Sequence, residues 1–340
     1  MKHVTIKDIA KELNLAASTI SRAFNEKYDI HPETRKRILE KAKQMGYRPN
    51  PIAVRLLQQR SMNIGIVIPE FIGCFFPEVI IGAQEVLFKE GYQTLITQSN
   101  ECSNNELQNV KLLYDNMVDG FLVSLTHETK NIEYYKELVD ADVPIVFFNR
   151  INEELKTSRV VFDDYKWSFF ATEHLIYEGY KKIYHFSGPS HLFLTQSRIK
   201  GFTDALKKHR LSLSDNKVFT SDFMIKDGEK AANALIESND IPEAIFAAGD
   251  LTAIGAMKVF KENGYRIPED IAFVGFSEST LASHVDPPLT SVAQPTYEIG
   301  RAAATLLLEQ INNKGVHIPQ TITLNGRLNI RSSSIRLTKP

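Results

Sequence analysis

Apolar runs of strand length alternate with amphipathic stretches of helix length from residue 63 to residue 311, and this alternation limits the possible folds most. The runs are apolar on both faces and are separated by helical patterns, which predicts parallel sheets covered on both sides. About a dozen such units are too many for one sheet, so we expect two doubly wound subdomains with a ligand between them at the carboxyl ends of the strands. The predicted strands are 63–71, 94–99, 119–125, 143–149, 181–188, 243–249 and 270–276, and the predicted helices are 75–92, 104–117, 131–141, 166–179, 196–209, 227–238, 251–264 and 296–311.

The stretch Thr5 to Asn25, TIKDIAKELNLAASTISRAFN, reads as two short helices joined by a tight turn. Thr5 is placed to cap the first helix, and Asp8 suits its positive N-terminal end. The second helix is expected from about Ala16. One face of the first helix is apolar at helical spacing, with Ile6, Ile9, Ala10 and Leu13, and the second helix turns Ile20, Ala23 and Phe24 inward.

The outer face of the second helix carries only small or hydrogen-bonding residues, namely Ala17, Ser18, Ser21 and Arg22. A helix that enters the DNA major groove needs small residues for close approach and a few hydrogen-bonding groups. Periodicity alone would also fit a helical hairpin that only packs.

The charge of the chain is divided unevenly, which favours the DNA interpretation. Residues 1–60 carry 13 Lys and Arg against 6 Asp and Glu, a net charge of +7, whereas the remainder carries 27 against 35, a net charge of −8. A basic head on an acidic body predicts that only the head meets a polyanion.

A third helix is expected from Pro32 to Gly46, basic outside, with an inner face of Ile38, Leu39, Ala42 and Met45. Two prolines then hold the segment YRPNP extended. The segment after them could form one or two helical turns. Its leucines, Leu56 and Leu57, either pack on the next domain or wedge between base steps in the minor groove.

The segments TIKDIAKELNLAASTISRAFN and PETRKRILEKAKQMGYRPNPIAVRLL resemble the LacI/GalR family of bacterial transcription regulators. The resemblance implies a helix-turn-helix domain at 1–48, a hinge at 49–61 and an effector-binding and dimerisation core at 62–340. It assigns base reading to Ala17, Ser18 and Arg22, DNA-backbone contacts to Thr5, Thr19, Ser21 and Asn25, hinge anchors to Tyr47 and Asn50, and the minor-groove wedge to Leu56.

The body is similar to the type I periplasmic-binding-protein fold, so the expected fold class is α/β, with an all-α head and two parallel-sheet subdomains. The resemblance implies an N-subdomain of about 62–161 and 293–323, a C-subdomain of about 162–291 and 325–340, and three crossings near Phe162, Val292 and Leu324. The effector-binding positions that it implies are Phe76, Asn149, Arg150, Arg198, Phe223, Asp250 and Ser277.

Two of these positions have open alternatives. Phe76 could be a buried helix-start residue rather than a stacking ring, and Arg198 could form a surface salt bridge rather than hold a ligand. At position 277 many sugar-responsive relatives have an aspartate that grips ligand hydroxyls. Ser277 cannot supply that charge-assisted bond, so the ligand is acidic or phosphorylated, or is a sugar held by other groups.

The sequence predicts no enzyme and no cofactor, because it contains no G-x-G-x-x-G, G-x-x-x-x-G-K-[ST], G-x-S-x-G or H-E-x-x-H motif. The two cysteines, Cys74 and Cys102, fit a reducing cytoplasm, and Lys2, Lys7 and Asp8 interrupt any export signal. We therefore expect a cytoplasmic homodimer that binds a pseudo-palindromic operator in double-stranded DNA, most simply as a repressor, under control of a small molecule such as a carbohydrate or its derivative. The alternative is a solute-binding protein of a transport or chemotaxis system.

Overall fold

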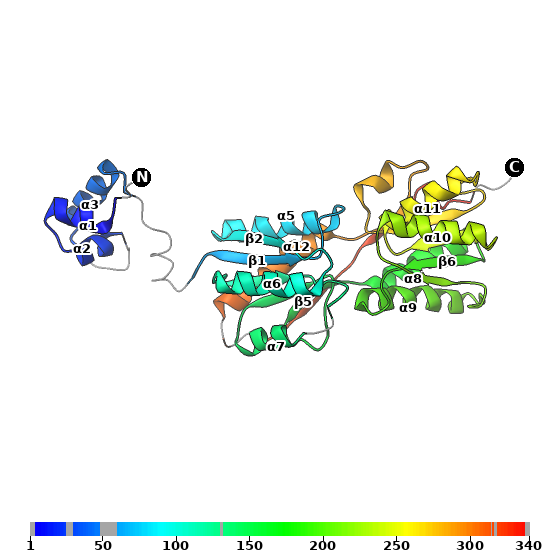
Figure 1. Ribbon diagram of the computed structural model, residues 1–340, viewed down its shortest axis with the longest axis horizontal. Coiled ribbons are helices and arrows are strands. Elements are labelled where there is room, and N and C mark those ends of the chain that lie inside the picture. The colour runs from blue at the N-terminus through cyan, green and yellow to red at the C-terminus, as the bar shows by residue number, and fades with distance from the viewer. Residues whose placement is uncertain are drawn as a thin grey trace. The chain divides into compact units, whose positions relative to one another are not determined.

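The structure is a computed structural model that describes residues 4–24, 30–47, 60–129, 132–313, 315 and 318–336. It divides into two compact units, Met1–Ser61 and Met62–Pro340. Figure 1 labels the helices and strands of both units.

Three helices form the described part of the first unit: α1 (Ile6–Leu13), α2 (Ala17–Ala23) and α3 (Pro32–Gln44). The capping of α1 confirms the prediction from sequence. The Asp8 backbone N–H donates to the Thr5 hydroxyl, and the Thr5 N–H donates to the Asp8 carboxylate at 2.8 Å. Asn14 then ends the helix in the left-handed conformation, with φ 52°, which asparagine tolerates better than most residues.

The small core of this unit contains six buried residues, Ile9, Ala10, Ile20, Ala23, Ile38 and Ala42. Leu39 was predicted to belong to it, and that prediction is wrong, because its side chain is 40% exposed. Ile38 and Ala42 are one turn apart and fill the narrow contact with α1 and α2. Leu39 is rotated about 100° from Ile38 and so points away from this contact.

The second unit contains two sheets, each six-stranded within the described ranges. The order is β11-β5-β4-β3-β1-β2 in the first sheet and β12-β10-β9-β8-β6-β7 in the second. All paired strands are parallel except β10 and β12. The first sheet comprises β1 (Asn63–Ile68), β2 (Gln93–Gln98), β3 (Gly120–Val123), β4 (Ile145–Phe148), β5 (Ser158–Phe162) and β11 (Thr321–Leu324), and the second comprises β6 (Ile183–Ser187), β7 (Val218–Thr220), β8 (Ala244–Ala247), β9 (Ala272–Phe276), β10 (Thr290–Ala293) and β12 (Arg327–Asn329).

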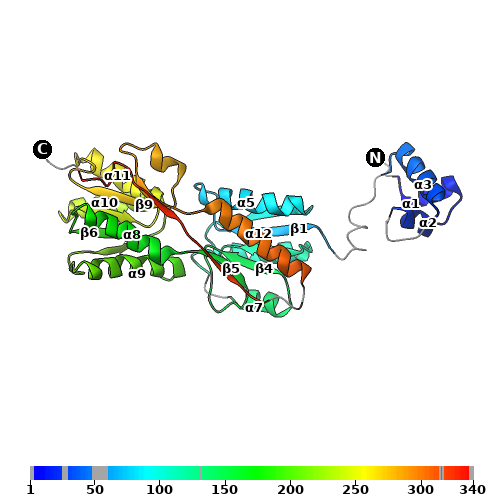
Figure 2. The same cartoon turned by 180° about the vertical axis from the view of Figure 1, so that it is seen from behind.

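Helices cover both faces of each sheet, as the alternating pattern predicted. The helices around the first sheet are α5 (Phe75–Lys89), α6 (Ser103–Asp115), α7 (Glu133–Asp140) and α12 (Thr296–Asn312), and those around the second are α8 (Asp164–Tyr177), α9 (Phe193–Lys208), α10 (Ile225–Glu237) and α11 (Asp250–Glu262), with the 3₁₀ turn η1 (Thr280–Ser283). The helix pairs α5–α12, α8–α9 and α10–α11 pack side by side (Figure 2). Strands β1, β3, β4, β6, β8 and β9 are almost entirely buried, which explains their continuous apolar runs.

The chain passes between the two halves of this unit three times. It leaves the first sheet after β5, returns from β10 to α12, and passes again from β11 to β12, as the red segment in Figure 2 shows. The strands at these passages, β5, β10, β11 and β12, were not predicted as strands, and neither was the edge strand β7. Within the described ranges, every helix is too short or too polar to cross a lipid bilayer.

We expect Thr5→Ala to destabilise the head by about 1 kcal/mol, because it removes the capping-box hydroxyl that accepts the Asp8 N–H and donates to the Asp8 carboxylate. Amide hydrogen exchange along α1, measured without DNA, tests this. Lys7→Ala, at an exposed position of the same helix, is the matched control. Equal exchange in the two variants would contradict the prediction.

Candidate functional site

The predicted base-reading residues lie together on α2. Ala17, Ser18 and Arg22 are exposed, and the two predicted backbone-contact residues of this helix, Thr19 and Ser21, are half-buried. This helix therefore presents small and hydrogen-bonding side chains on one accessible face, which suits the major groove.

The other predicted DNA residues are placed less uniformly. Thr5 is exposed at the start of α1, and Tyr47 is half-buried, with its ring centroid 5.2 Å from that of Phe24. Arg35 of α3 was not among these predicted residues. It donates its Nε hydrogen to the Ala23 carbonyl at 3.1 Å and so links α3 to the C-terminal end of α2. Asn25, Asn50, Leu56 and Leu57 lie outside the described residues.

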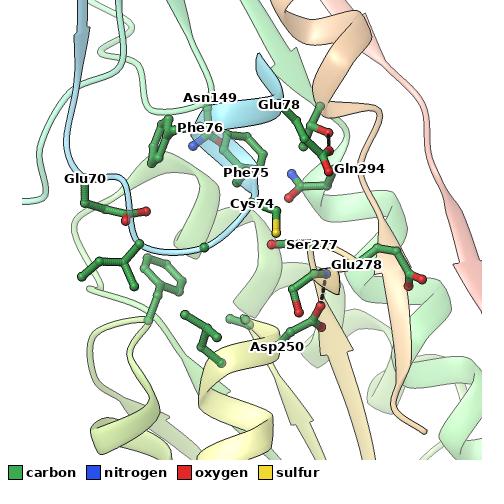
Figure 3. Close-up of a pocket in the computed structure, with 18 of the residues that line it drawn as sticks. Glu70, Cys74, Phe75, Phe76, Glu78, Asn149, Asp250, Ser277, Glu278 and Gln294 are labelled. Atoms are coloured by element: carbon green, nitrogen blue, oxygen red, sulfur yellow. Dashed lines mark hydrogen bonds between the residues drawn. The ribbon is translucent and has the colours of Figure 1, made fainter. Parts of the chain in front are cut away.

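A cavity lies between the two halves of the second unit, at the carboxyl ends of the strands, with an empty volume of about 770 Å³ that includes open solvent. All seven predicted effector residues line it: Phe76, Asn149, Arg150, Arg198, Phe223, Asp250 and Ser277. Figure 3 shows Glu70, Phe75 and Asn149 on one side of the cavity and Asp250, Ser277 and Glu278 on the other.

Arg198 is held inside the wall by Asp164. Its Nε and Nη2 atoms lie 2.8 and 2.7 Å from Asp164 Oδ1, and its Nη1 donates to the Ala248 carbonyl at 2.6 Å. The Arg198 guanidinium also lies 3.8 Å from the Phe276 ring centroid. Both members of the pair are buried, so the alternative of a surface salt bridge is wrong. Burial raises the pKa of Asp164 and lowers that of Arg198, and each partner opposes the shift of the other.

Arg150 is paired in the same way in the first half. Its Nη1 atom lies 2.7 and 2.8 Å from the two carboxylate oxygens of Glu101, which also accepts the His127 backbone N–H at 3.0 Å. The Arg150 guanidinium lies 5.7 Å from the Phe223 ring, which comes from the second half. The Phe223 ring fits there because residue 188 is glycine: a Cβ on Gly188 would lie only 2.0 Å from the ring.

Asp250 begins α11 and anchors the loop that follows β9. Its Oδ1 accepts the Ser291 hydroxyl at 2.6 Å, and its Oδ2 accepts the Ser279 backbone N–H. Burial raises the pKa of Asp250 to about 7 against these hydrogen bonds. The anchored loop contains Ser277 and Glu278, which have φ angles of 102° and 55°. Asp250 thus fixes a strained turn, because non-glycine residues seldom adopt positive φ.

Aromatic side chains form the first-half wall at the start of α5. Phe76 is 3% exposed and packs edge-to-face against Phe75 and Phe148, so most of its ring belongs to the core. Phe75 is the more accessible of the two rings. Phe76 therefore lines the cavity but is mostly a core residue, as the buried alternative predicts, and stacking on a ligand ring stays a prediction.

Several lining residues were not among the predicted effector positions. Glu70 and Gln294 reach the cavity from the loop after β1 and from the segment between β10 and α12. Burial raises the pKa of Glu70 to about 7. Asp164, the partner of Arg198, has no sequence signal beyond an acidic residue at a helix start. Glu70 was a candidate for the cleft from sequence, because it lies at the end of the first predicted strand.

Hydrogen bonds also join the two halves around the cavity. Cys74 Sγ lies 2.6 Å from Thr280 Oγ1 on one side, and His191 is hydrogen-bonded to the His127 carbonyl on another. The described residues include no group of three or more His, Cys, Asp or Glu side chains arranged to hold a metal ion. The cavity can therefore enclose a small molecule between two walls whose separation is set by a few contacts.

Comparisons with known proteins agree with this architecture. Residues 5–50 match the family described as bacterial regulatory proteins, lacI family, and residues 172–334 match the periplasmic binding protein-like domain. The chain is 30% identical to catabolite control protein A of Priestia megaterium over 98% of this chain and 99% of that protein. It is 32% identical to the ribose operon repressor of Halalkalibacterium halodurans over 91% of each. Among solved structures, a complex of the transcriptional regulator CelR with cellobiose is 29% identical, with a TM-score of 0.74 over 97% of this chain and 100% of that chain.

A helix-turn-helix head joined to a ligand-binding body of two parallel sheets defines a DNA-binding transcriptional repressor rather than a solute-binding protein. The chain belongs to the lacI family of bacterial regulatory proteins. This family is made up of transcriptional regulators, which are generally not enzymes.

We expect Asp164→Leu to cost about 3–5 kcal/mol of unfolding free energy, because it leaves the Arg198 charge buried without a partner. The double variant Asp164→Leu/Arg198→Met removes both charges and is expected to recover most of that loss. Urea unfolding of the second unit, followed by circular dichroism, measures both. A double variant no more stable than the single one would contradict the importance of this pair.

Proposed function

We propose that this chain binds a pseudo-palindromic operator as a homodimer, and that a small metabolite in the cavity between the two halves of its body controls this binding. The observation that carries the proposal is the convergence of all seven predicted effector residues on one cavity. Most of those residues are far apart in the sequence, and they come from both halves of the body. Their convergence is what a ligand site at the carboxyl ends of parallel strands requires.

In the head, we assign base reading to Ala17, Ser18 and Arg22, whose exposed side chains share α2. The net charge of +7 over residues 1–60 supports electrostatic attraction to the phosphates. Contacts to the DNA backbone are proposed for Thr5, Thr19, Ser21 and Asn25, hinge contacts for Tyr47 and Asn50, and the minor-groove wedge for Leu56.

The proposed control uses the three passages of the chain between the halves. A ligand that binds one arrangement of the halves more tightly shifts the population toward it, and the segment at 49–61 passes the change to the heads. The same coupling allows two outcomes: the ligand either releases the repressor from DNA or is needed for it to bind. The ligand class is a carbohydrate or related metabolite, which agrees with the names of the ribose operon repressor and the CelR–cellobiose complex.

The exposed edge of the first sheet supports a dimer. Large apolar side chains are exposed on β2 and on the two helices that contact it. In a monomer they would remain in water and would not stabilise the fold. They are Ile81 and Phe88 of α5, Leu95 and Ile96 of β2, Leu112 and Tyr114 of α6, and the adjacent Met117. The occupant we propose is a second copy of the chain, because a two-fold operator requires a two-fold protein.

The remaining functional assignments follow from this proposal. A regulator that binds operator DNA acts in the cytoplasm, and its cavity serves binding without chemical turnover. The free cysteines Cys74 and Cys102 are consistent with a reducing compartment.

Binding of the wild-type protein to operator candidates tests the proposal, with sites selected from random duplexes. We expect Arg22→Ala to lose about 1–3 kcal/mol on the selected site and little on random DNA, because a bidentate base contact is specific. Fluorescence anisotropy at several salt concentrations measures both affinities. Equal losses on the two duplexes would mean that Arg22 contacts only phosphate, and no selected site at all would overturn the proposed function.

We expect Leu112→Glu to convert the dimer into monomers and to weaken operator binding at least tenfold, because it places a charge in the proposed apolar interface. Leu112 is 57% exposed, so the folded monomer should be unaffected. Sedimentation velocity measures the assembly. The matched control is Tyr177→Glu on α8, which is 72% exposed outside this surface. Dimers that survive Leu112→Glu but not Tyr177→Glu would place the interface elsewhere.

A further inference from the structure

Two polar atoms in the wall of the effector cavity are buried without a hydrogen-bond partner among the described residues: Glu70 Oε2 and Gln294 Nε2. Gln294 is only 7% exposed. Buried polar groups in folded proteins are almost always paired, and each exception needs an explanation. Two exceptions on the wall of one cavity, one an acceptor and one a donor, are groups that a ligand in the cavity can complete.

The positive charges of this wall are already neutralised. The two arginines that line it, Arg150 and Arg198, are each held at hydrogen-bond distance by a buried or half-buried carboxylate, Glu101 and Asp164. An acidic or phosphorylated ligand would need an uncommitted cation to offset the loss of its hydration. The wall favours a ligand without net charge.

Most of the carboxylates that line the cavity are also committed. Asp250 accepts hydrogen bonds on both oxygens, from Ser291 and Ser279. Glu278 forms an ion pair with Arg331, with Oε2 and Nη1 3.1 Å apart. Glu78 accepts the Thr296 hydroxyl.

Glu70 is different. It receives a hydrogen bond from the Ile72 backbone, but its Oε2 has no partner, and Figure 3 shows its carboxylate pointing toward the cavity.

We propose that Glu70 is the carboxylate that grips hydroxyl groups of an uncharged polyhydroxyl effector, in place of the aspartate that position 277 lacks. This inference rests on the proposed function and specifies the ligand class of the same cavity. Gln294 Nε2 complements Glu70, because it donates a hydrogen bond where Glu70 accepts one. A hydroxyl group can do both, so a polyol or sugar satisfies both residues.

The charges around Glu70 set the pH dependence of binding. Arg150 lowers the pKa of Glu70 and Glu101 raises it, but burial is the main cause of the rise to about 7. Ligand hydroxyls donate to the ionised carboxylate, so ligand affinity should increase as the pH rises through about 7. Asp250 has a similar pKa, and His127 lies beside Glu101, so a variant at position 70 is needed to assign the effect.

The experiment is a thermal-shift screen of the full chain against uncharged pentoses, hexoses, disaccharides and ribonucleosides, each beside its phosphate ester. We expect an uncharged compound to raise the melting temperature. We expect Glu70→Gln to weaken its binding roughly 10- to 100-fold, as for loss of a hydrogen bond to a charged group, and to flatten the pH dependence. Glu90→Gln, at the exposed end of α5, is the matched control.

A second readout separates ligand binding from a structural role. Folding raises the pKa of Glu70 to about 7. At pH values above 7 the ionised carboxylate therefore destabilises the folded state. Below the ordinary glutamate pKa, Glu70 is protonated in both the folded and the unfolded state, and this effect disappears. The ligand-free Glu70→Gln variant should therefore be at least as stable as the wild type at pH above 7. A less stable variant at that pH would overturn the inference.

Three other results would also overturn it: stabilisation only by phosphate esters, no stabilisation by any uncharged compound, or undiminished ligand affinity in Glu70→Gln. Operator binding by the wild type is measured in parallel. Its absence would refute the proposed function, whereas operator binding together with any of these results would refute only the inference about Glu70 and the uncharged ligand class.

Discussion

The structure depends on one topological constraint: parallel strands end at the same edge of their sheet, and the two sheets of the body present those edges to each other. The loops after β1, β4, β8 and β9 therefore converge, although they are separated by long helices in the sequence. The three passages between the halves connect the sheets without filling the space between their edges. A cavity with two walls, joined by a few hydrogen bonds at its margin, is the direct result.

Burial of charge then determines what this cavity can bind. Arg150 and Arg198 would each be costly to bury alone, and Glu101 and Asp164 offset that cost within the wall. Pairing leaves two guanidinium groups that are rigid and oriented but electrically neutralised. Asp250 is committed to holding the turn at Ser277 and Glu278. The groups left for a ligand are the unpartnered ones, and these are suited to hydroxyls rather than to phosphate.

The sequence predicted the helices and the fully buried strands because their periodicity is strong, and its resemblance to the LacI/GalR family supplied the seven predicted effector positions that line the cavity. It did not predict β7, β11 or β12, which are sheet-edge strands of three or four residues with exposed positions. It missed β10 because the buried Thr290 and Ser291 are polar. Their hydroxyls donate to the Arg331 carbonyl and to Asp250, which are distant in the sequence. Asp164 and Glu70 acquire their roles only from tertiary neighbours, and for the same reason Leu39 was wrongly assigned to the core.

The central claim is that ligand binding in the cavity and operator binding at the head are coupled through one conformational change of the body. The most direct measurement is the reciprocal one: ligand affinity by calorimetry with and without saturating operator duplex, and operator affinity by anisotropy with and without saturating ligand. Thermodynamic linkage requires the two ratios to be equal, and the account predicts that they differ from one. Ligand affinity that is the same with and without operator, in a protein that binds both, would contradict the account.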